Sequence, residues 1–315
     1  MADFLWQWLK ATYDPTALWA SISTILITYG AWSIAERVYP AERGQPLRLA
    51  IFNLWAGLVY ILLTRIGAFV GGSIAAFIIA QLWGGPLISW DLQAAAASVP
   101  GWLVYAALVP LAFLPLLTFD FFYYWFHRFQ HEWPWFWHVH KLHHTDMALN
   151  VTTSSRHHWL EDFFRAILIV VPMTLLLQLK PAEAGFLTVI IGQWGSFIHS
   201  NIRLRMGPLT AVFGGPQYHR IHHSIERAHW NKNYAAFFPV WDQVFGTQHR
   251  PGPQEWPKTG VEGESSTPPA AELIAGPFIG WAKTIAARLG RAKPAESQVP
   301  ISMIARHETK VVALD

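Results

Sequence analysis

The chain has 315 residues, of which 52% are hydrophobic and only 14% charged, and it contains 18 tryptophans and 20 phenylalanines. This composition is typical of a membrane protein. A net charge of +3 is too small to indicate a nucleic-acid partner, and the absence of cysteine excludes disulfides and thiolate metal ligands.

Uncharged runs predict about four to six membrane segments, because a helix needs about 20 apolar residues to cross a bilayer. The run at residues 66–90 is interrupted by Gly71 and Gly72. The run at 166–179 is short and contains Pro172, which suits a re-entrant segment. The candidate segments are residues 15–35, 49–64, 66–90, 92–119, 166–179 and 184–202.

The distribution of basic residues predicts the orientation in the membrane. Residues 83–101 contain no lysine or arginine. The histidine-rich segments, in contrast, are flanked by Arg128, Lys141, Arg156, Arg165, Arg203, Arg205, Arg220, Arg227 and Lys232. The histidines are therefore expected on the cytoplasmic side. Arg37, Arg43 and Arg48 also favour that side, which requires an odd number of crossings between residues 49 and 83; the sequence leaves that number open.

All 15 histidines lie at or beyond His127, and most of them occur in three short motifs. HRFQH begins at His127, HKLHH at His140 and HRIHH at His219. On a helix, these spacings bring the imidazoles to one face within about one turn. A single zinc ion takes three or four protein ligands, so eight imidazoles predict two metal ions, and imidazole suits iron, zinc and copper. The eight residues are His127, His131, His140, His143, His144, His219, His222 and His223.

Asp120 ends an apolar run, where an unpaired carboxylate is costly. Metal-bound histidines usually donate their second N–H to a carboxylate or a carbonyl. We expect Asp120 to be buried and to accept a hydrogen bond from a ligand histidine of another cluster, such as His199 or His223. Asp242 has two interpretations, the same role toward the last cluster or a cap of a helix or turn.

In order and spacing, the histidine motifs resemble those of the fatty acid hydroxylase / sterol desaturase superfamily of membrane di-iron oxygenases. The similarity covers residues 115–250 and continues through RHHWLE at 156–161, FIHSN at 197–201 and NKNYAAFFPVWDQVFGT at 231–247. Ala235 departs from the glycine that members often carry after Asn-Tyr, which affects the turn and no ligand.

The resemblance implies further site residues. His199 in FIHSN is expected to be a ninth metal ligand. His158 and Glu161 match the RxHxxE pattern and are expected either to bind metal or to orient a ligand; no catalytic residue is expected beyond the ligands and their supports. The remaining histidines of this region lack a partner at metal-binding spacing and are expected at the surface or the lipid interface: His138, His157, His229 and His249.

The resemblance also implies the fold and the activity. The fold is expected to be all-α, a multi-pass membrane helical bundle with a cytoplasmic cap that carries the histidine clusters. Two iron ions, which zinc can replace in purified protein, would use O2 to hydroxylate or desaturate a lipid from the bilayer. The sequence has no haem motif, GxGxxG or iron–sulfur cysteines, so electrons are expected from a separate donor, a ferredoxin or a cytochrome b5-like protein.

Two other classes of protein stay open, a membrane zinc-dependent hydrolase and a metal transporter. The hydrolase motif HExxH is absent, and the spans before Asp120 do not carry ionisable residues at the middle of the membrane. Neither the lipid nor the oligomeric state is predicted.

Three regions are expected along the chain. Residues 1–114 form a transmembrane holder region, and residues 115–250 form the catalytic region. Residues 251–315 begin with a Pro/Gly-rich linker. Residues 272–291 then form either a helix on the membrane interface or part of a poorly ordered tail.

Overall fold

The computed structural model describes residues 10, 13–89, 97 and 99–290. The end of the predicted tail, residues 291–315, and most of residues 90–98 in the predicted span at 92–119 lie outside this description. The described residues are largely helical. The only strands among the described residues are the two-residue β1 (Ile88–Ser89) and β2 (Leu177–Gln178), which pair in parallel with Ile88 opposite Leu177. The prediction of an all-α fold is confirmed.

Five helices of 19 residues or more form the frame of the molecule: α2 (Pro15–Val38), α3 (Leu47–Leu82), α5 (Val104–Glu132), α9 (Pro181–His199) and α12 (Ala270–Arg288). The shorter segments are α6 (Pro134–His144), η1 (Val151–Ser155), α7 (Leu160–Arg165), η2 (Ala166–Val170), α8 (Val171–Leu176), η3 (Gly207–Ala211), α10 (Pro216–His222), η4 (Arg227–His229) and α11 (Val240–Val244).

Within the described residues, two helices are long and apolar enough to cross a membrane, Leu18–Val38 within α2 and the whole of α3. Their side chains are mostly not covered by protein: Trp19 and Ile27 of α2 are 68% and 72% exposed, and Phe77 of α3 is 66% exposed. Such an extended apolar surface is typical of a helix that faces lipid. The predicted larger number of segments and the cytoplasmic side of the cap stay predictions.

α3 continues through Gly71 and Gly72, which interrupt the apolar run in the sequence, as one helix of 36 residues. At about 1.5 Å per residue it is about 54 Å long, more than the ~30 Å hydrocarbon core of a bilayer. A single crossing by α3 would give the odd number that the basic residues require between residues 49 and 83.

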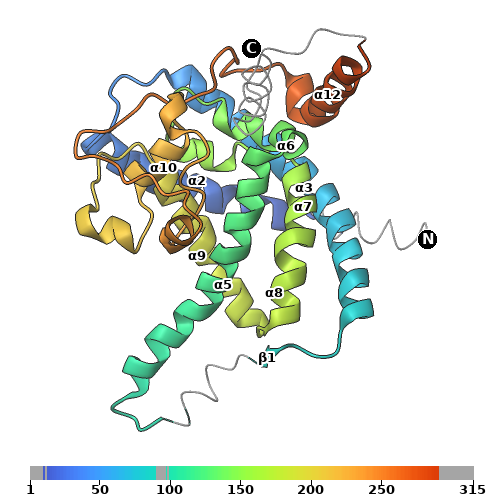
Figure 1. The fold of residues 1–315 in the computed structure, drawn as a ribbon, viewed down its shortest axis with the longest axis vertical. Helices are drawn as coiled ribbons and strands as arrows, with labels where there is room; N and C mark the ends of the chain where they lie inside the picture. The colour runs from blue at the N-terminus through green and yellow to red at the C-terminus, as the bar shows by residue number, and fades with distance from the viewer. Residues whose placement is uncertain (1–9, 11–12, 90–96, 98, 291–315) are drawn as a thin grey trace, which may run out of the picture.

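The segments α7, η2 and α8 follow one another directly and lie beside α3 and α5 (Figure 1). Pro172 has no N–H to donate, and just before it the backbone forms the π-helical turn η2. Phe126 of α5, Ile169 of η2, Met173 of α8 and Leu177 of β2 form a buried apolar cluster. This cluster packs α5 against η2, α8 and β2.

The histidine-bearing helices α6 and α10 gather at the end of the molecule opposite β1 (Figure 1). The chain between residues 251 and 269 also lies there. Thr259, Gly260 and Val261 are buried, and the N–H of Gly260 donates to the carbonyl of His223. α12 then packs against α6 and α3. The Pro/Gly-rich segment is thus in direct contact with a histidine motif.

Candidate metal centre

The turn between α5 and α6 brings the first two histidine motifs together. Trp133 has an extended backbone (φ −106°, ψ 120°), and Pro134 occupies the first turn of α6. A proline fixes φ and disfavours a helical residue before it, so α5 ends here and the chain reverses direction. His140 of α6 then lies beside His127 of α5, with their ring centroids 4.9 Å apart.

The nine histidines predicted as ligands converge in two groups, each with its ligand nitrogens within 4.8 Å of one another. The first group takes side chains from α5, α6 and α10; the second takes them from α6, α9 and α10 with the residue that follows it. Either group could hold a metal ion. The first group is His127, His131, His140, His144 and His222, and the second group is His143, His199, His219 and His223.

The two HxxHH motifs contribute to the groups in opposite ways. In α6, the first and last histidines join the first group and His143 joins the second. In the HRIHH motif, His219 and His223 join the second group and His222 joins the first. On a helix, residues i+3 and i+4 lie on opposite sides of residue i, about 100° apart around the axis, so the i+3 ring can turn toward a different site from the other two. Each motif therefore reaches two neighbouring sites, and the rings of His144 and His223 stack between them at 4.2 Å.

Hydrogen bonds fix which nitrogen of several rings carries the proton. A carbonyl oxygen only accepts, so Nδ1 of His127, His199 and His222 must be the donor to Tyr234 (2.7 Å), Gly195 (2.6 Å) and Lys232 (2.9 Å), respectively. A neutral imidazole has one N–H, so each Nε2 of these rings carries a lone pair. The Nε2 of His222 is buried and has no hydrogen-bond partner among the described residues.

Several of these nitrogens point at one another across short distances. Nε2 of His140 lies 3.1 Å from Nε2 of His127 and 3.1 Å from Nε2 of His144. Nε2 of His199 lies 2.9 Å from those of His143 and His219. Buried lone pairs that face each other without a proton between them are unfavourable. A cation between them removes this cost, so the donor set fits a metal ion.

The histidines are held in the neutral form that a metal ion requires. Burial first, and then the neighbouring imidazoles, keep the pKa of His143, His144 and His223 well below the usual range. Burial also lowers the pKa of His222 to about 3, although its hydrogen bond to Lys232 acts in the other direction. At neutral pH these rings are therefore uncharged.

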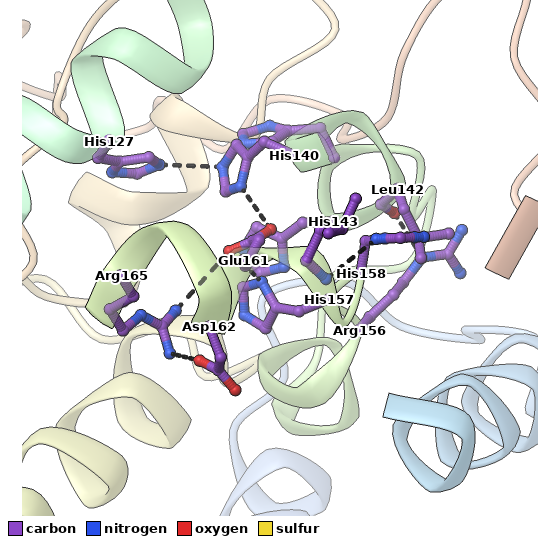
Figure 2. Close-up of polar contacts among 12 residues, drawn as sticks. His127, His140, Leu142, His143, Arg156, His157, His158, Glu161, Asp162 and Arg165 are labelled. Atoms are coloured by element: carbon purple, nitrogen blue, oxygen red, sulfur yellow. Dashed lines mark hydrogen bonds and ion pairs between the residues drawn. The ribbon is translucent and has the colours of Figure 1, made fainter. Parts of the chain in front are cut away.

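Glu161 supports the first group from the side of α7. Its Oε1 accepts a hydrogen bond from Nδ1 of His140 at 3.1 Å, so His140 lies between Glu161 and His127 (Figure 2). Burial acts to raise the pKa of Glu161, but His157 and His140 outweigh it and hold this pKa well below its usual range. The ionised carboxylate thus orients His140 with its lone pair toward the group.

Within RHHWLE, His157 lies next to the site, and His158, which the resemblance indicated, does not. Nδ1 of His157, expected at the surface, lies 3.1 Å from Oε2 of Glu161, and its ring stacks on His143 with centroids 4.2 Å apart. His158 joins neither group, because its Nε2 faces the carbonyl of Ile274 in α12 at 3.2 Å. The i, i+4 spacing of His157 and Glu161 was the signal that could have found this pair.

The expected hydrogen bond between Asp120 and a ligand histidine is wrong. Asp120 is fully buried, but its carboxylate accepts from the backbone N–H groups of Ala236, Phe237 and Phe238 at 2.7–3.0 Å. These donors belong to the turn that precedes α11. Asp120 therefore anchors the chain that follows Tyr234, whose carbonyl orients His127.

Asp242 caps a turn, as one of its two interpretations predicted, and does not contact the last histidine cluster. Its carboxylate accepts from the backbone N–H of Tyr234 and of Ala235, each at 2.9 Å. It also accepts from the hydroxyls of Tyr218 and Thr247. Both carboxylates thus shape the segment at 234–238 and act on the site only through its backbone.

Comparisons with known proteins agree with this geometry. Residues 112–247 match the family described as fatty acid hydroxylase. An ornithine lipid hydroxylase from Rhizobium tropici is 35% identical over 174 residues, which are 54% of this chain and 51% of the relative. Alkylglycerol monooxygenase from Homo sapiens is 32% identical over 131 residues, 42% of this chain and 29% of the relative. A very-long-chain aldehyde decarbonylase from Arabidopsis thaliana is 28% identical over 171 residues, 51% of this chain and 26% of the relative.

The matches cover about half of these relatives or less. No solved structure matches this chain. The predicted similarity to the fatty acid hydroxylase / sterol desaturase superfamily is confirmed by the family match and by the relatives.

Proposed function

We propose that the protein is a membrane-bound oxygenase that hydroxylates a lipid, because residues 112–247 match the fatty acid hydroxylase family. It uses molecular oxygen, two iron ions and electrons from a separate donor. The observation that carries this proposal is the convergence of nine histidines in two adjacent groups with lone pairs facing inward.

The number of histidines supports iron over tetrahedral zinc. The first group offers five imidazoles, whereas a zinc ion takes three or four protein ligands. Five ligands suit a five- or six-coordinate ion such as iron, which imidazole also binds.

The residues of the chain hold and orient this centre. Two iron ions would supply the redox chemistry by which a C–H bond, O2, two electrons and two protons give an alcohol and water. The carbonyls of Tyr234, Gly195 and Lys232 fix the rings of His127, His199 and His222 with Nε2 inward. Glu161 does the same for His140 through its carboxylate. These supports keep the ligands oriented in either oxidation state of the ions.

The relatives favour hydroxylation over desaturation, because the names of the ornithine lipid hydroxylase and the alkylglycerol monooxygenase both specify oxygen insertion. Both names also specify a lipid with a polar head group. We therefore assign this chain a substrate with a polar head and a long alkyl chain that enters from the bilayer. The electron donor is a ferredoxin or a cytochrome b5-like protein on the cytoplasmic side.

The proposal is tested by metal content together with isotope labelling. Wild-type protein reconstituted anaerobically with ferrous iron should retain two ions per chain. With a chemical reductant, 18O2 and a mixture of polar lipids, it should transfer one labelled oxygen atom to a lipid. His143→Ala and His222→Ala each remove a ligand from a different group and should abolish the transfer, and so should a chelator.

His138→Ala is the matched control, because His138 lies outside both groups and contacts Thr284 of α12. It should keep both ions and full activity. Retention of at most one ion by the wild-type protein would contradict the dinuclear centre. A lipid product labelled from H2(18)O instead of 18O2 would indicate hydrolysis and would contradict the oxygenase.

A further inference from the structure

A third set of side chains that could hold a metal ion lies outside both histidine groups. His229 at the end of η4 and His249 both direct Nε2 at the same oxygen, Oε1 of Glu255, each at 3.0 Å. The ligand atoms of the three residues lie within 4.8 Å of one another. The two rings meet nearly edge to face, with centroids 4.8 Å apart. The expectation that His229 lies at the surface or the lipid interface is wrong, because it is only 4% exposed.

Each member of this triad is held in place by a second contact. Nδ1 of His229 lies 2.8 Å from the hydroxyl oxygen of Ser224. The other oxygen of Glu255 accepts from the N–H of Gly252 at 2.6 Å. The backbone N–H of His249 donates to the side chain of Asn233 at 2.7 Å. Rings and carboxylates fixed by such outer contacts are typical of metal sites.

The triad is also accessible. The side chains of His249 and Glu255 are 28% and 29% exposed, so an ion can enter from water and keep water as its remaining ligands. The 3.0 Å separations between nitrogen and oxygen fit ligands that share one ion at about 2.0–2.2 Å. Two imidazoles and one carboxylate suit a divalent transition metal such as zinc, and not calcium or magnesium, which prefer oxygen ligands.

We propose that His229, His249 and Glu255 bind one divalent transition-metal ion of the zinc type, and that this ion fastens the chain at 249–255 to α10. This site is separate from the two histidine groups, and the proposal does not depend on the oxygenase activity.

The ligands join two stretches of chain that border α10. Ser224, which contacts His229, directly follows His223. Asn233, which holds the backbone of His249, donates from its amide to the carbonyl of Tyr218, next to His219. On the other stretch, Gln217 donates to the carbonyls of Gly252 and Glu255. An ion at the triad therefore closes the chain over the helix that carries the last histidine motif.

Zinc content tests the site. Full-length protein without a polyhistidine tag is loaded with zinc and passed through metal-free buffer, and bound zinc is counted per chain. Wild type should hold about one zinc ion more than Glu255→Gln and one more than His249→Gln. Glu262→Gln is the matched control, because Glu262 is 68% exposed and lies outside the triad. It should bind as much zinc as wild type.

Proteolysis provides a second measurement. Lys258 is exposed and follows Glu255 closely in the chain, and trypsin should cleave the Lys258–Thr259 bond, whose carbonyl accepts from the N–H of Ile225, when the loop opens. At zinc concentrations ten times Kd, the open population falls about tenfold, so cleavage of wild type should slow about tenfold, whereas cleavage of the variants should not respond.

Both readouts are differences between variants, so they hold whether or not the two histidine groups contain iron. Equal zinc content in wild type, Glu255→Gln and His249→Gln would overturn the proposal and leave a hydrogen-bonded triad. If Glu255→Gln does not fold, His249→Gln decides, because its side chain is partly exposed.

Discussion

Arg156 is a fully buried cation that fixes the end of α6. Its Nε donates to the carbonyl of Leu142 at 2.8 Å, and Nη2 donates to the hydroxyl of Thr145 at 2.6 Å. Nη1 donates to Asn53 of α3 and to the carbonyl of Ser266. Burial lowers the pKa of Arg156 to about 10, so it remains protonated at neutral pH. Since Leu142 and Thr145 flank His143 and His144, this side chain positions ligands of both groups.

We predict that Arg156→Met lowers the free energy of unfolding by about 3–5 kcal/mol, because buried acceptors lose their charged donor. Arg156→Lys keeps the charge but cannot reach all four acceptors, so it should fall between methionine and wild type. Thermal unfolding and the rate of iron loss to a chelator measure the effect. Arg227→Met is the control; Arg227 is 77% exposed, and its change should stay within about 0.5 kcal/mol. Unchanged iron retention in Arg156→Met would show that Arg156 does not position the ligands.

At the scale of residues, spacing and resemblance predicted which nine histidines lie together, because helical periodicity acts directly on i, i+3 and i+4 positions. They did not predict the outer contacts. Glu161 was found because it lies one turn from the RHH stretch, but the choice between His157 and His158 depends on the irregular chain before α7. The partners of Asp120 are backbone N–H groups 116–118 residues away, which no local pattern indicates.

At the scale of elements, α3 is a continuous helix whose glycines serve close packing. A Cβ built on Gly67 would lie 2.7 Å from the carbonyl oxygen of Trp159. On Gly71 it would lie 2.7 Å from the carbonyl oxygen and 2.8 Å from Cα of Phe163. The next residue, Gly72, has no atom within 4 Å of the same position. The sequence shows two adjacent glycines that interrupt an apolar run. Only the contact with α7 in the structure shows that Gly71 lets another backbone approach closely.

This pair gives a matched test of the α3–α7 contact. Gly71→Ala should destabilise the protein by about 1–3 kcal/mol, because the obstructing atoms are backbone and cannot rotate away. It should also speed the loss of iron, because Glu161, which orients the ligand His140, lies in α7. Gly72→Ala should be neutral or stabilising by up to about 1 kcal/mol through helix propensity. Thermal unfolding in detergent measures both, and equal unfolding temperatures would contradict the packing role.

At the scale of the whole molecule, the C-terminal part shows where composition misleads. A Pro/Gly-rich stretch predicts a linker, yet Ser266 accepts from Arg156 and Gly260 donates to His223. His158 and Trp159 both contact the carbonyl of Ile274 in α12. These contacts join residues far apart in the chain and use backbone atoms, so they cannot be predicted from the residue types. The helical class follows from composition and periodicity, whereas this closure of the site needs the three-dimensional structure.

The arrangement of the whole molecule across the membrane is open to a direct test, because the chain contains no cysteine and any introduced thiol is the only one. Leu87 is 81% exposed and lies between α3 and β1, whereas Arg227 lies in η4, whose His229 contacts Ser224 next to α10. Figure 1 shows β1 at the opposite end of the molecule from α6 and α10. The stretch 83–101 has no basic residue, and the histidine-bearing end has many, so the positive-inside tendency places Arg227 in the cytoplasm and Leu87 on the opposite side.

We therefore predict that Arg227→Cys reacts with a membrane-impermeant maleimide in inverted vesicles and not in intact cells, and that Leu87→Cys shows the opposite pattern. Permeabilised cells should label both variants, and the cysteine-free wild type should label in neither preparation. Labelling of both thiols from one side would mean that α3 does not cross the bilayer. Labelling of Arg227→Cys in intact cells alone would place the histidine groups outside the cytoplasm, and with them the proposed contact with a cytoplasmic electron donor would be lost.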